Sequence, residues 1–425
     1  MKKGGVLLIT YKFPPSGGST AIRAALFAKY LPFFDITPTV VAGPFMAGDP
    51  RDEGMAAEMK GVAVHRPWKW DLSRLTAPLE KRLPIIRRLL NFFFGTVYWI
   101  SWTYAVRGFL MRLVGQGEKP NAVFLTAPPF ALLLLAETLK RKYHDIPLVL
   151  DMRDEWTINP FFEKVRSPWK SRVEANLEAR AFRFADKITC ATQPITEDYM
   201  RKYPEWARKF ETLWNGYDPE AFNGIACYRK TPALSIVYAG SLGQPGLSST
   251  PFLRAVEKWL SLHPDRKKQL RVKFYGKFFE DREYWTVRLG ECIEFHPHLP
   301  YREIVQICRQ ADFLLLTFEN TFRGKHLAPC KLFEYIAARR PMLSVIPKGE
   351  SGARALIEQY RLGTIADVEK EQEILEALDR VWTTWQAGDF PNPDLTEPLE
   401  RFSRKNLAKR LAEIFREVSR GPACP

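Results

Sequence analysis

The sequence has little of several features that would narrow its class at once. It contains six cysteines in 425 residues, and none of them forms a C-x-x-C pair. This spacing favours neither a zinc site nor a redox motif, and is typical of reduced thiols in a cytosolic protein. No low-complexity tract or repeat of fixed period is present. Neither G-x-G-x-x-G nor G-x-x-x-x-G-K-[ST] occurs, so neither phosphate-binding motif can be invoked.

Long uncharged runs are also scarce. The opening "MKKGGVLLIT" has too short an apolar stretch for a signal peptide, and we expect a first strand there. Between Arg88 and Arg107 lie 18 uncharged residues, close to the length of about 20 that a membrane span needs. Polar residues interrupt them, and the α/β pattern continues on both sides. For residues 80–113 two alternatives stay open: core-facing helices, or an interfacial segment whose basic and aromatic side chains meet an anionic membrane.

Length and charge bound the remaining classes. A chain of 425 residues exceeds the usual size of one hydrophobic core, so two domains are expected. The formal net charge of +15 indicates an anionic partner, such as nucleic acid, a phosphorylated substrate or an acidic membrane. No compact Lys/Arg block is interleaved with aromatic residues, which disfavours nucleic acid.

Apolar strand-like runs alternate with helical ones along the whole chain. Runs such as "GVLLIT", "NAVFLTAPP" and "IPLVLDMRD" predict buried parallel strands, and the pattern restarts at "LSIVYAGS". The expected fold class is α/β, with two doubly wound Rossmann-like domains that face each other across a cleft. We expect an N-terminal domain over 1–213, a C-terminal domain over 214–396, and a basic amphipathic helix over 397–419 that packs back on the N-terminal domain.

A glycine pair marks the first strand-to-helix turn. In "FPPSGGSTAIR", Gly17 and Gly18 allow the backbone to approach a ligand closely, and the following helix presents free N–H groups. Neighbouring serine and threonine hydroxyls are candidate N-caps. Such a turn favours a phosphate, although an ordinary strand-to-helix turn has the same residues. Arg23, in that helix, either reaches the ligand or braces the helix.

A second turn into a helix carries a cation. In "HLAPCKLFEYIAARRPMLSV", Pro329 precedes a predicted helix and Lys331 lies in its first turn, a poor place for a cation unless an anion is near. Glu334 follows three residues later on the same face. The alternative is an i, i+3 surface ion pair.

This stretch also carries a resemblance. The string P-x-K-x-x-E-Y-x-A-x-x-x-P is similar to the donor-binding signature of retaining GT-B glycosyltransferases, and resembles glycosyltransferase family 4 (glycosyl transferases group 1). Further segments resemble that family in the expected order. They are "FPPSGGSTAIR", "LTAPPFALLLLA", "LVLDMRDEWT", "ADKITCATQPITEDYMRKYP", "LWNGYDPEAF", "IVYAGSLG", "FYGK" and "HLPYREIVQICRQADFLLL".

The resemblance implies a function and a set of site residues. The enzyme would move a hexosyl or N-acetylhexosaminyl group, with retention, from a nucleotide diphosphate sugar to a hydroxyl of a glycan or lipid-linked acceptor in cell-surface polysaccharide synthesis. It would need no metal or other cofactor. From the charge pattern we expect no nucleic-acid partner, and from the cysteines and the segment 80–113 we expect a cytoplasmic protein that is peripheral on the inner face of the plasma membrane. Glu334 would bind the ribose and Lys331 the diphosphate. The other implied donor-binding residues are Gly17, Gly18, Gly240, Ser241, Arg323, Lys325, His326 and Leu332.

Two departures from the family pattern stand out. His326 occupies a position where the family often has a glutamate, and "GSLGQPGLSS" lacks the bases that many members carry after that strand. Arg323 and Lys325 are candidates to supply the missing charge, unless "ENTFRGKHLAP" is a solvated basic loop.

A charged cluster ends another predicted strand. "LDMRDEW" places Asp151, Arg153, Asp154 and Glu155 at a carboxyl end, where α/β proteins bind ligands. Arg153 and Asp154 join Lys331 as candidate catalytic residues, because a carboxylate there can accept a proton or hydrogen bond from an acceptor hydroxyl. An Arg–Asp pair that holds the loop is the alternative.

Two rival functions remain. A nonhydrolysing nucleotide-sugar epimerase on the same twin-Rossmann frame needs no acceptor. A non-enzymatic module would bind an anion or a membrane without turnover. The base, the sugar and the acceptor are not determined by these motifs.

Overall fold

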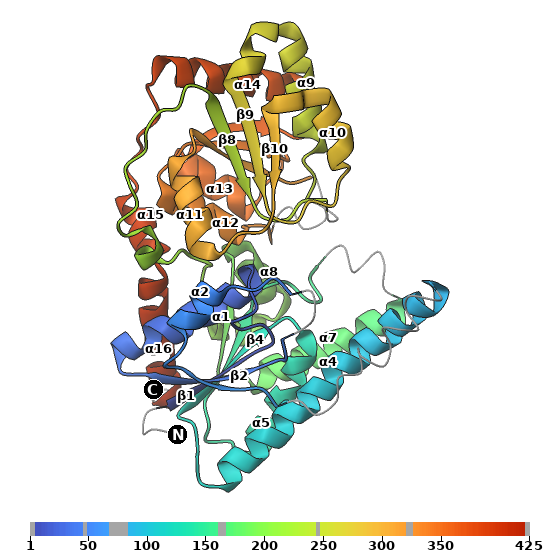
Figure 1. The fold of residues 1–425 in the computed structure, drawn as a ribbon. Coiled ribbons are helices and arrows are strands. Elements are labelled where there is room, and N and C mark those ends of the chain that lie inside the picture. Colours follow the sequence, from blue (N-terminus) through green and yellow to red (C-terminus); the bar gives the residue numbers. More distant parts are fainter. Residues whose placement is uncertain are drawn as a thin grey trace. The chain divides into compact units, whose positions relative to one another are not determined.

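A computed structural model describes residues 5–45, 49–67, 84–159, 167–243, 247–319 and 326–420, with residues 84–99 described only as part of a helix. The chain forms two compact units. Unit 1 comprises Met1–Trp214 together with Leu407–Pro425, and unit 2 comprises Asn215–Asn406. Each is described here by itself (Figure 1).

Unit 1 is built on a seven-stranded parallel sheet in the order β3-β2-β1-β4-β5-β6-β7. Its inner strands β1, β4 and β5 are buried along their whole length, as expected when helices cover both faces. The strands are β1 (Gly5–Thr10), β2 (Thr37–Ala42), β3 (Ala63–His65), β4 (Ala122–Ala127), β5 (Leu148–Met152), β6 (Lys187–Cys190) and β7 (Phe210–Thr212).

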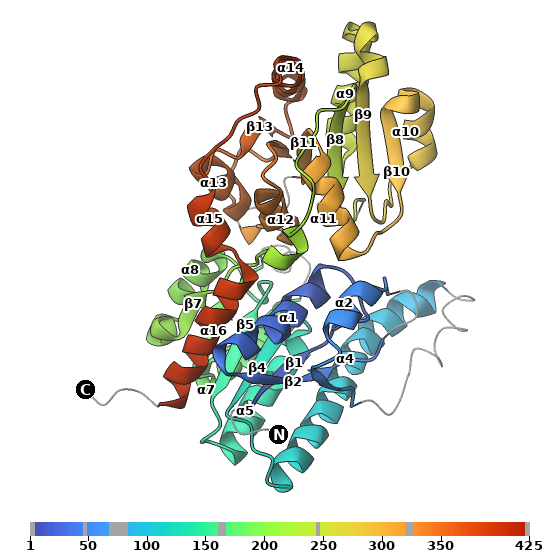
Figure 2. The same ribbon diagram turned by 60° about the vertical axis from the view of Figure 1, so that its left-hand side comes forward.

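Helices cover the two faces of this sheet. Helices α1, α2 and α16 lie on one face, and α4, α5, α7 and α8 lie on the other (Figures 1 and 2). The α-helices are α1 (Ser19–Tyr30), α2 (Glu53–Glu58), α4 (Pro84–Gly115), α5 (Leu135–Lys142), α7 (Pro168–Phe184), α8 (Gln193–Lys202) and α16 (Arg404–Ser419). Three short 3-10 helices are η1 (Leu31–Phe34), η2 (Phe130–Leu134) and η3 (Pro204–Lys209).

Unit 2 repeats the plan with six parallel strands in the order β10-β9-β8-β11-β12-β13. They are β8 (Leu234–Ala239), β9 (Leu270–Tyr275), β10 (Ile293–His296), β11 (Phe313–Thr317), β12 (Met342–Ile346) and β13 (Gly363–Asp367). The α-helices are α9 (Thr250–Leu262), α10 (Arg282–Leu289), α11 (Tyr301–Gln310), α12 (Cys330–Ala338), α13 (Gly352–Gln359), α14 (Glu371–Ala387) and α15 (Thr396–Arg401), and the 3-10 helices are η4 (Pro219–Phe222), η5 (Pro264–Gln269) and η6 (Gly290–Cys292). One face of the sheet packs on α9, α10 and α14.

The predicted fold class is confirmed in both units. In each sheet the strand order reverses once, between β1 and β4 in unit 1 and between β8 and β11 in unit 2. In open α/β sheets, ligands bind outside the carboxyl ends of the strands at such a switch point. A ligand site is therefore expected at each of the two switch points.

The segment 80–113 folds largely as the helix α4. From Ser101 onward its side chains alternate between two environments: Trp102, Val106 and Leu110 are buried in the core of unit 1, whereas Tyr104 and Arg107 are exposed. The core-facing interpretation is therefore right for this part, and the other side of the helix faces solvent. Across the described residues, we find no helix with the length and apolarity to cross a membrane.

The predicted C-terminal helix 397–419 is two helices, because the chain breaks its helical course between α15 and α16. The second of them belongs to unit 1 from Leu407 onward. The ring of Phe415 packs edge-on against Phe124 of β4, with 6.1 Å between centroids, and Arg410 donates to both carboxylate oxygens of Glu211 on β7.

Candidate functional site

The candidate site of unit 2 lies at the switch point between β8 and β11. Helix α12 begins at Cys330, shortly after β11, with Pro329 in extended conformation at its N-cap and no side-chain cap. Its first turn therefore leaves N–H groups without intrahelical partners at the carboxyl edge of the sheet. The hydroxyl of Tyr335, further along α12, accepts a hydrogen bond of 2.9 Å from the Ala239 N–H at the end of β8.

Lys331 extends from this first turn over the end of β8. Its Nζ lies 3.6 Å from the centroid of the Tyr238 ring. Among the described residues, it has no hydrogen-bond partner and no carboxylate within ion-pair distance. Burial lowers its pKa to about 7, against the opposing charge of Glu334. An enclosed ammonium without a partner lies here at the carboxyl edge of the sheet. An anionic ligand would supply the missing counter-charge.

Glu334 lies one turn further along the same helix face. The i, i+3 ion pair with Lys331 does not form: within the described part of the chain, Glu334 has neither an ion pair nor a hydrogen bond. Burial raises its pKa to about 7, while Lys331 and Arg404 act in the opposite direction. The carboxylate is close to the hydroxyl of Tyr301 and the thiol of Cys308, both on α11, whose pKa values it raises in addition to burial. A half-buried acceptor that has no donor among the described residues is ready for a hydroxyl from a ligand.

Two glycines bare the backbone beside Lys331. Gly240 has φ +134°, and a Cβ there would lie 2.7 Å from the Lys331 Nζ. Gly276 has φ +138°, and its Cβ would meet the Gly240 carbonyl oxygen at 2.3 Å. Both positions therefore require glycine. The strand ends are joined by two bonds, in which the Gly240 N–H donates to Tyr275 and the Gly276 N–H donates to His296.

The remaining predicted donor-binding residues of unit 2 differ in what they offer. Ser241 is half-buried directly after Gly240, and its carbonyl accepts a 3.2 Å hydrogen bond from the Tyr238 hydroxyl. His326 is buried. Leu332 lies in the core, and its N–H donates to the Pro329 carbonyl, so it presents no group to a ligand. Arg323 and Lys325 lie outside the described residues.

In unit 1 the glycine pair follows β1, at that unit's switch point. Gly18, not a serine or threonine, is the N-cap of α1; its φ is +87°, and no side chain caps the helix. A Cβ at Gly18 would have no atom within 4 Å. The loop itself is pinned, because the Gly17 N–H donates to Pro50 at 2.7 Å and the Asp52 N–H donates to Pro15 at 3.0 Å. The backbone here is both fixed and open on one side.

Sequence reasoning missed the residue that fastens this loop from the other side. Arg66, directly after β3, donates to the carbonyls of Gly43, Phe13 and Pro14, the last at 2.7 Å. One guanidinium thereby ties together the ends of β1, β2 and β3. The only signal in the sequence was a base at the end of a short strand, which by itself predicts nothing.

Arg153 spans the switch point of unit 1. It donates to the Thr20 carbonyl in α1 at 2.8 Å, and to the carbonyls of Ala127 and Pro128 after β4. Its side chain is thus occupied in joining three segments. Asp154 lies half-buried in the same loop after β5, at the carboxyl edge of the sheet.

Arg23 braces the fold and does not face a ligand. Its guanidinium forms a two-bond ion pair with Asp151 of β5, at 2.7 and 2.9 Å, and donates to the Leu213 and Trp214 carbonyls. Thr126 and Thr189 also donate to Asp151. Burial alone would raise the pKa of Asp151, but the charge and hydrogen bonds of Arg23 hold it below its ordinary value. Asp151, the first acidic residue of "LDMRDEW", is thus paired with Arg23 of α1, a contact that the sequence did not predict.

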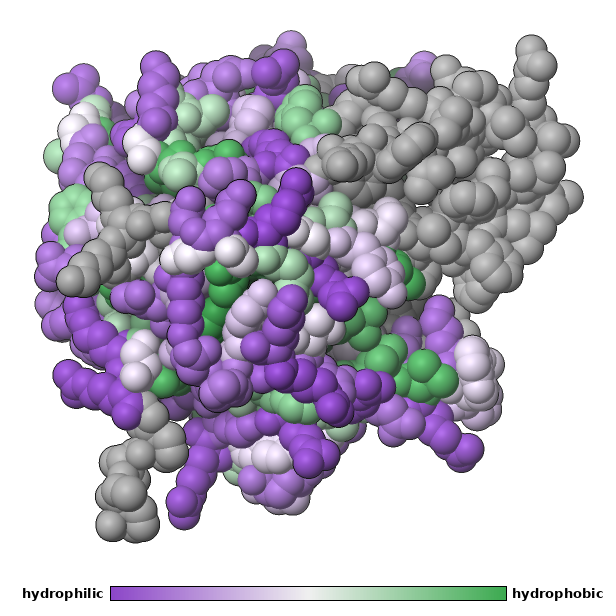
Figure 3. Space-filling view, turned by 90° about the horizontal axis from the view of Figure 1, so that it is seen from below, coloured by the Kyte–Doolittle hydropathy of each residue, from purple (hydrophilic) through white to green (hydrophobic). Residues whose placement is uncertain are grey.

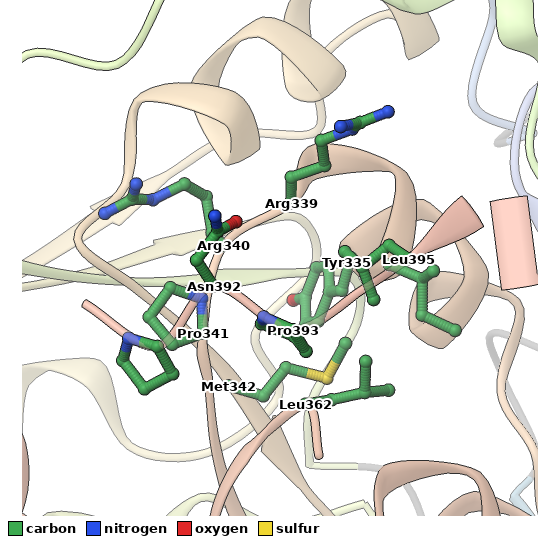
Figure 4. A pocket seen from close by; sticks show the side chains of 11 residues that line it. Tyr335, Arg339, Arg340, Pro341, Met342, Leu362, Asn392, Pro393 and Leu395 are labelled. Carbon is green, nitrogen blue, oxygen red and sulfur yellow. The ribbon is translucent and has the colours of Figure 1, made fainter. Parts of the chain in front are cut away.

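A pocket at the opposite end of α12 is a separate feature (Figure 4). It lies between the C-terminal end of α12 and the segment that carries Asn392 and Pro393, and the Arg339 and Arg340 side chains point away from it. Its volume of about 20 Å³ has room for roughly one water molecule. It cannot hold a sugar nucleotide.

No group of three or more His, Cys, Asp or Glu side chains in the described ranges has an arrangement that could hold a metal ion.

Comparisons with known proteins bear on the fold. No family model matches the chain, and no curated protein does. Solved structures match over nearly its whole length. A glycosyltransferase from Rickettsia africae has a TM-score of 0.62 at 10% identity and covers 100% of both chains. Anabaena HepE in complex with UDP-glucose has a TM-score of 0.60 at 15% identity, over 97% of this chain and 99% of that one.

A third structure, MnaA of S. aureus with UDP, has a TM-score of 0.55 at 13% identity and covers 98% of this chain and 97% of that one. At such identities the likeness concerns the fold alone. With two doubly wound parallel sheets of seven and six strands, the chain has the α/β GT-B fold.

Proposed function

We propose that the protein is a glycosyltransferase that takes its sugar from a nucleotide diphosphate donor bound at the unit 2 switch point. The observation that carries this proposal is the pair Lys331 and Glu334: an ammonium and a carboxylate, largely enclosed, on one helix face, and neither bonded to any other described residue. A sugar nucleotide supplies the complement of each, a diphosphate for the ammonium and ribose hydroxyls for the carboxylate. The complex of the similarly folded HepE with UDP-glucose supports this class of donor.

The residues suggest how transfer would be assisted. Negative charge grows on the diphosphate as the sugar departs, and Lys331 with the free N–H groups of α12 would stabilise it in a site shielded from water. Bare backbone at Gly240 would let the phosphates approach the ammonium. No metal or other cofactor is part of the proposal.

The acceptor side of the proposal rests on unit 1. Gly17 and Gly18 present an open backbone before α1, and Asp154 is the carboxylate we propose to accept a hydrogen bond from the acceptor hydroxyl. Arg153 would position that loop through its bonds to three carbonyls. Retention, a hexosyl or N-acetylhexosaminyl donor, and a glycan or lipid-linked acceptor in surface polysaccharide synthesis follow from the sequence resemblance and are proposed on that basis.

We further propose peripheral attachment to the anionic inner face of the plasma membrane. The solvent side of α4 carries Tyr104, Arg107 and Arg112, all exposed, and no acidic residue between Ser101 and Gly115. Each base near such a surface contributes about 1 kcal/mol. On the coloured part of the face in Figure 3, hydrophilic side chains predominate and apolar ones form smaller patches between them.

A nucleotide panel tests the donor site. UDP, GDP, ADP and their sugar conjugates are compared by thermal shift and titration calorimetry, because a ligand that binds only the folded state raises Tm. Glu334→Gln should weaken binding of the preferred nucleotide by about 1.5–3 kcal/mol, the cost of a hydrogen bond to a charged group. Glu376→Gln, an exposed change on α14, should leave it unaltered. If no nucleotide diphosphate binds the wild-type protein, the proposal fails.

An acceptor requirement separates transfer from the second candidate. A likeness in fold to a putative UDP-N-acetylglucosamine 2-epimerase from Listeria monocytogenes, with a TM-score of 0.57 at 11% identity, keeps a nucleotide-sugar epimerase in consideration. With the preferred donor, consumption that rises with added polysaccharide or lipid extract supports transfer. Exchange at the sugar C2 without an acceptor would support the epimerase.

A further inference from the structure

We propose that Tyr238 is a positioning residue for Lys331, whose ammonium it holds at the end of β8 through the face of its ring. The inference rests on the proposed donor site and adds to it the element that orients the cation. The contact is close, with 3.6 Å between the Lys331 Nζ and the ring centroid. At this distance an ammonium is attracted by the negative face of the aromatic ring.

The ring itself cannot turn away. Tyr238 is fully buried, and belongs to the core cluster of unit 2 with Phe274 at 5.9 Å between centroids. Its hydroxyl donates to the Ser241 carbonyl at 3.2 Å, immediately after the glycine that Lys331 covers. The ring is thus fixed at one end by packing and at the other by a hydrogen bond.

The helix that carries Lys331 is fastened to the same strand. The Ala239 N–H, next to Tyr238 in β8, donates to the hydroxyl of Tyr335 on α12. Tyr335 lies one turn after Lys331 on the side of α12 that faces β8. Two tyrosines therefore set the distance between the ammonium and the strand end, and the ammonium donates none of its N–H groups to another described residue.

An aromatic partner has a specific advantage at an anion site. A carboxylate would fix Lys331 equally well, but it would compete with the phosphate for the charge and the N–H groups. A ring stabilises the cation while all three N–H groups stay available. The described groups that face Lys331 are consistent with this: Glu334 and Cys330 on α12, Cys308 on α11, and Tyr238 on β8, and none of the described carboxylates is within ion-pair distance.

The test replaces the ring without changing its shape. Position 238 is occupied in turn by Phe and by phenylalanines with one, two and three ring fluorines, which progressively weaken the negative face of the ring. Tyr238→Phe removes the bond to Ser241 and keeps the ring, so it should retain most of the activity. Across the fluorine series, affinity for the preferred nucleotide diphosphate and kcat/KM should fall steadily, by on the order of tenfold to thirtyfold in total.

Two further readouts distinguish positioning from a general structural effect. The pKa of Lys331, measured by NMR on the ligand-free protein, should fall along the series by about one pH unit, because the ring no longer stabilises the charged form. The alkaline limb of the kcat/KM profile should move to lower pH by the same amount. Tm should stay nearly constant, since the ring volume is conserved.

The outcomes are separable from those of the proposed function. A Lys331 pKa that does not change with fluorination overturns the positioning role, whatever the activity. A pKa that falls as expected in a protein that binds no nucleotide would uphold the Tyr238–Lys331 contact and reject the donor site. Tyr238→Leu, which removes the ring, should reproduce the full effect; if it unfolds, the fluorinated series still decides.

Discussion

The two units differ both in net charge and in whether the cations at the carboxyl edge of the sheet have partners. Unit 2 holds 27 Lys and Arg against 25 Asp and Glu, whereas the rest of the chain holds 36 against 23, so their net charges are +2 and +13. Yet the nearly neutral unit contains the unpaired ammonium. At the carboxyl edge of unit 1 the cations are engaged: Arg23 with Asp151, Lys12 with Asp49, and Arg153 and Arg66 with carbonyls.

This contrast shows that net charge and a binding site are different properties. A surplus of charge spread over a surface attracts anions from a distance and is weakened by salt. A single cation that is enclosed and left without a partner binds one anion in one place. Substitution of individual cations in each unit separates these two properties.

The largest effect is expected from breaking the paired cation of unit 1. Arg23→Met leaves the buried Asp151 without its partner, which should lower the free energy of unfolding by about 3–5 kcal/mol. Urea denaturation measures this. Arg51→Met is the matched control, because the Arg51–Glu53 pair is exposed and should contribute less than about 1 kcal/mol. Equal losses in the two variants would mean that Arg23 is not a brace.

Lys331→Met should give the reverse result in unit 2. Removing an enclosed, unpaired ammonium relieves a desolvation cost, so stability should be unchanged or higher. Turnover should fall by on the order of 10²–10³, because charge that develops on the departing diphosphate loses its main partner. Lys268→Met is the control, because Lys268 is exposed in η5, just before the amino end of β9. A destabilised but active Lys331→Met protein would contradict the proposed role.

The surplus charge of unit 1 predicts a smaller effect on membrane contact. Arg107→Gln with Arg112→Gln should weaken co-sedimentation with anionic vesicles by about 2 kcal/mol, and added salt should weaken it further. The control is Lys267→Gln with Lys268→Gln in unit 2, which removes the same charge from the other unit. If the wild-type protein does not bind anionic vesicles at low salt, the surplus charge has another use.

The smallest effect concerns protons. Lys331 and Glu334 both titrate near pH 7 in the free protein. A diphosphate favours the charged lysine, and ribose hydroxyls favour the charged glutamate. Above pH 7, where Lys331 is neutral and Glu334 already charged, binding should therefore take up a proton; below pH 7 it should release one.

The sign change is measurable by calorimetry of nucleotide binding in buffers of different ionisation enthalpy. Affinity should be highest near pH 7 and fall on either side by up to about 1.4 kcal/mol per pH unit. A proton exchange of one sign across pH 6–8 would show that only one of the two groups faces the ligand. Lys331→Met should abolish the uptake, and Glu334→Gln the release.

The fold and the two switch-point turns were predictable because they depend on local pattern. Apolar strands, helix periodicity, Gly17 with Gly18, and Lys331 three residues before Glu334 are all visible in short stretches of sequence. The C-terminal break between α15 and α16 was missed, because its helical pattern continues through Phe402 and Ser403, whereas the backbone at the break is hydrogen-bonded to the distant Tyr217.

The sequence could not predict which side chains contact each other when they are far apart in the chain. Arg23 and Asp151 are 128 residues apart, and Lys331 on α12 contacts Tyr238 on β8. The absence of an ion pair between Lys331 and Glu334 is also a tertiary property, since both lie on α12 but the Lys331 Nζ lies over the ring of Tyr238 on β8. The i, i+3 spacing alone favoured a surface ion pair between Lys331 and Glu334. In the structure Lys331 instead lies against Tyr238 of β8.

The return of α16 to unit 1 has a consequence for synthesis. Unit 2 is one uninterrupted stretch, so a ribosome delivers all of it before the residues from Leu407 onward exist. Unit 1 starts first and finishes last, because Phe415 must still pack on Phe124 and Arg410 must still reach Glu211. While unit 2 is being synthesised, the part of the sheet of unit 1 that α16 covers, at β4, is therefore still exposed. A chaperone would be most needed during that interval.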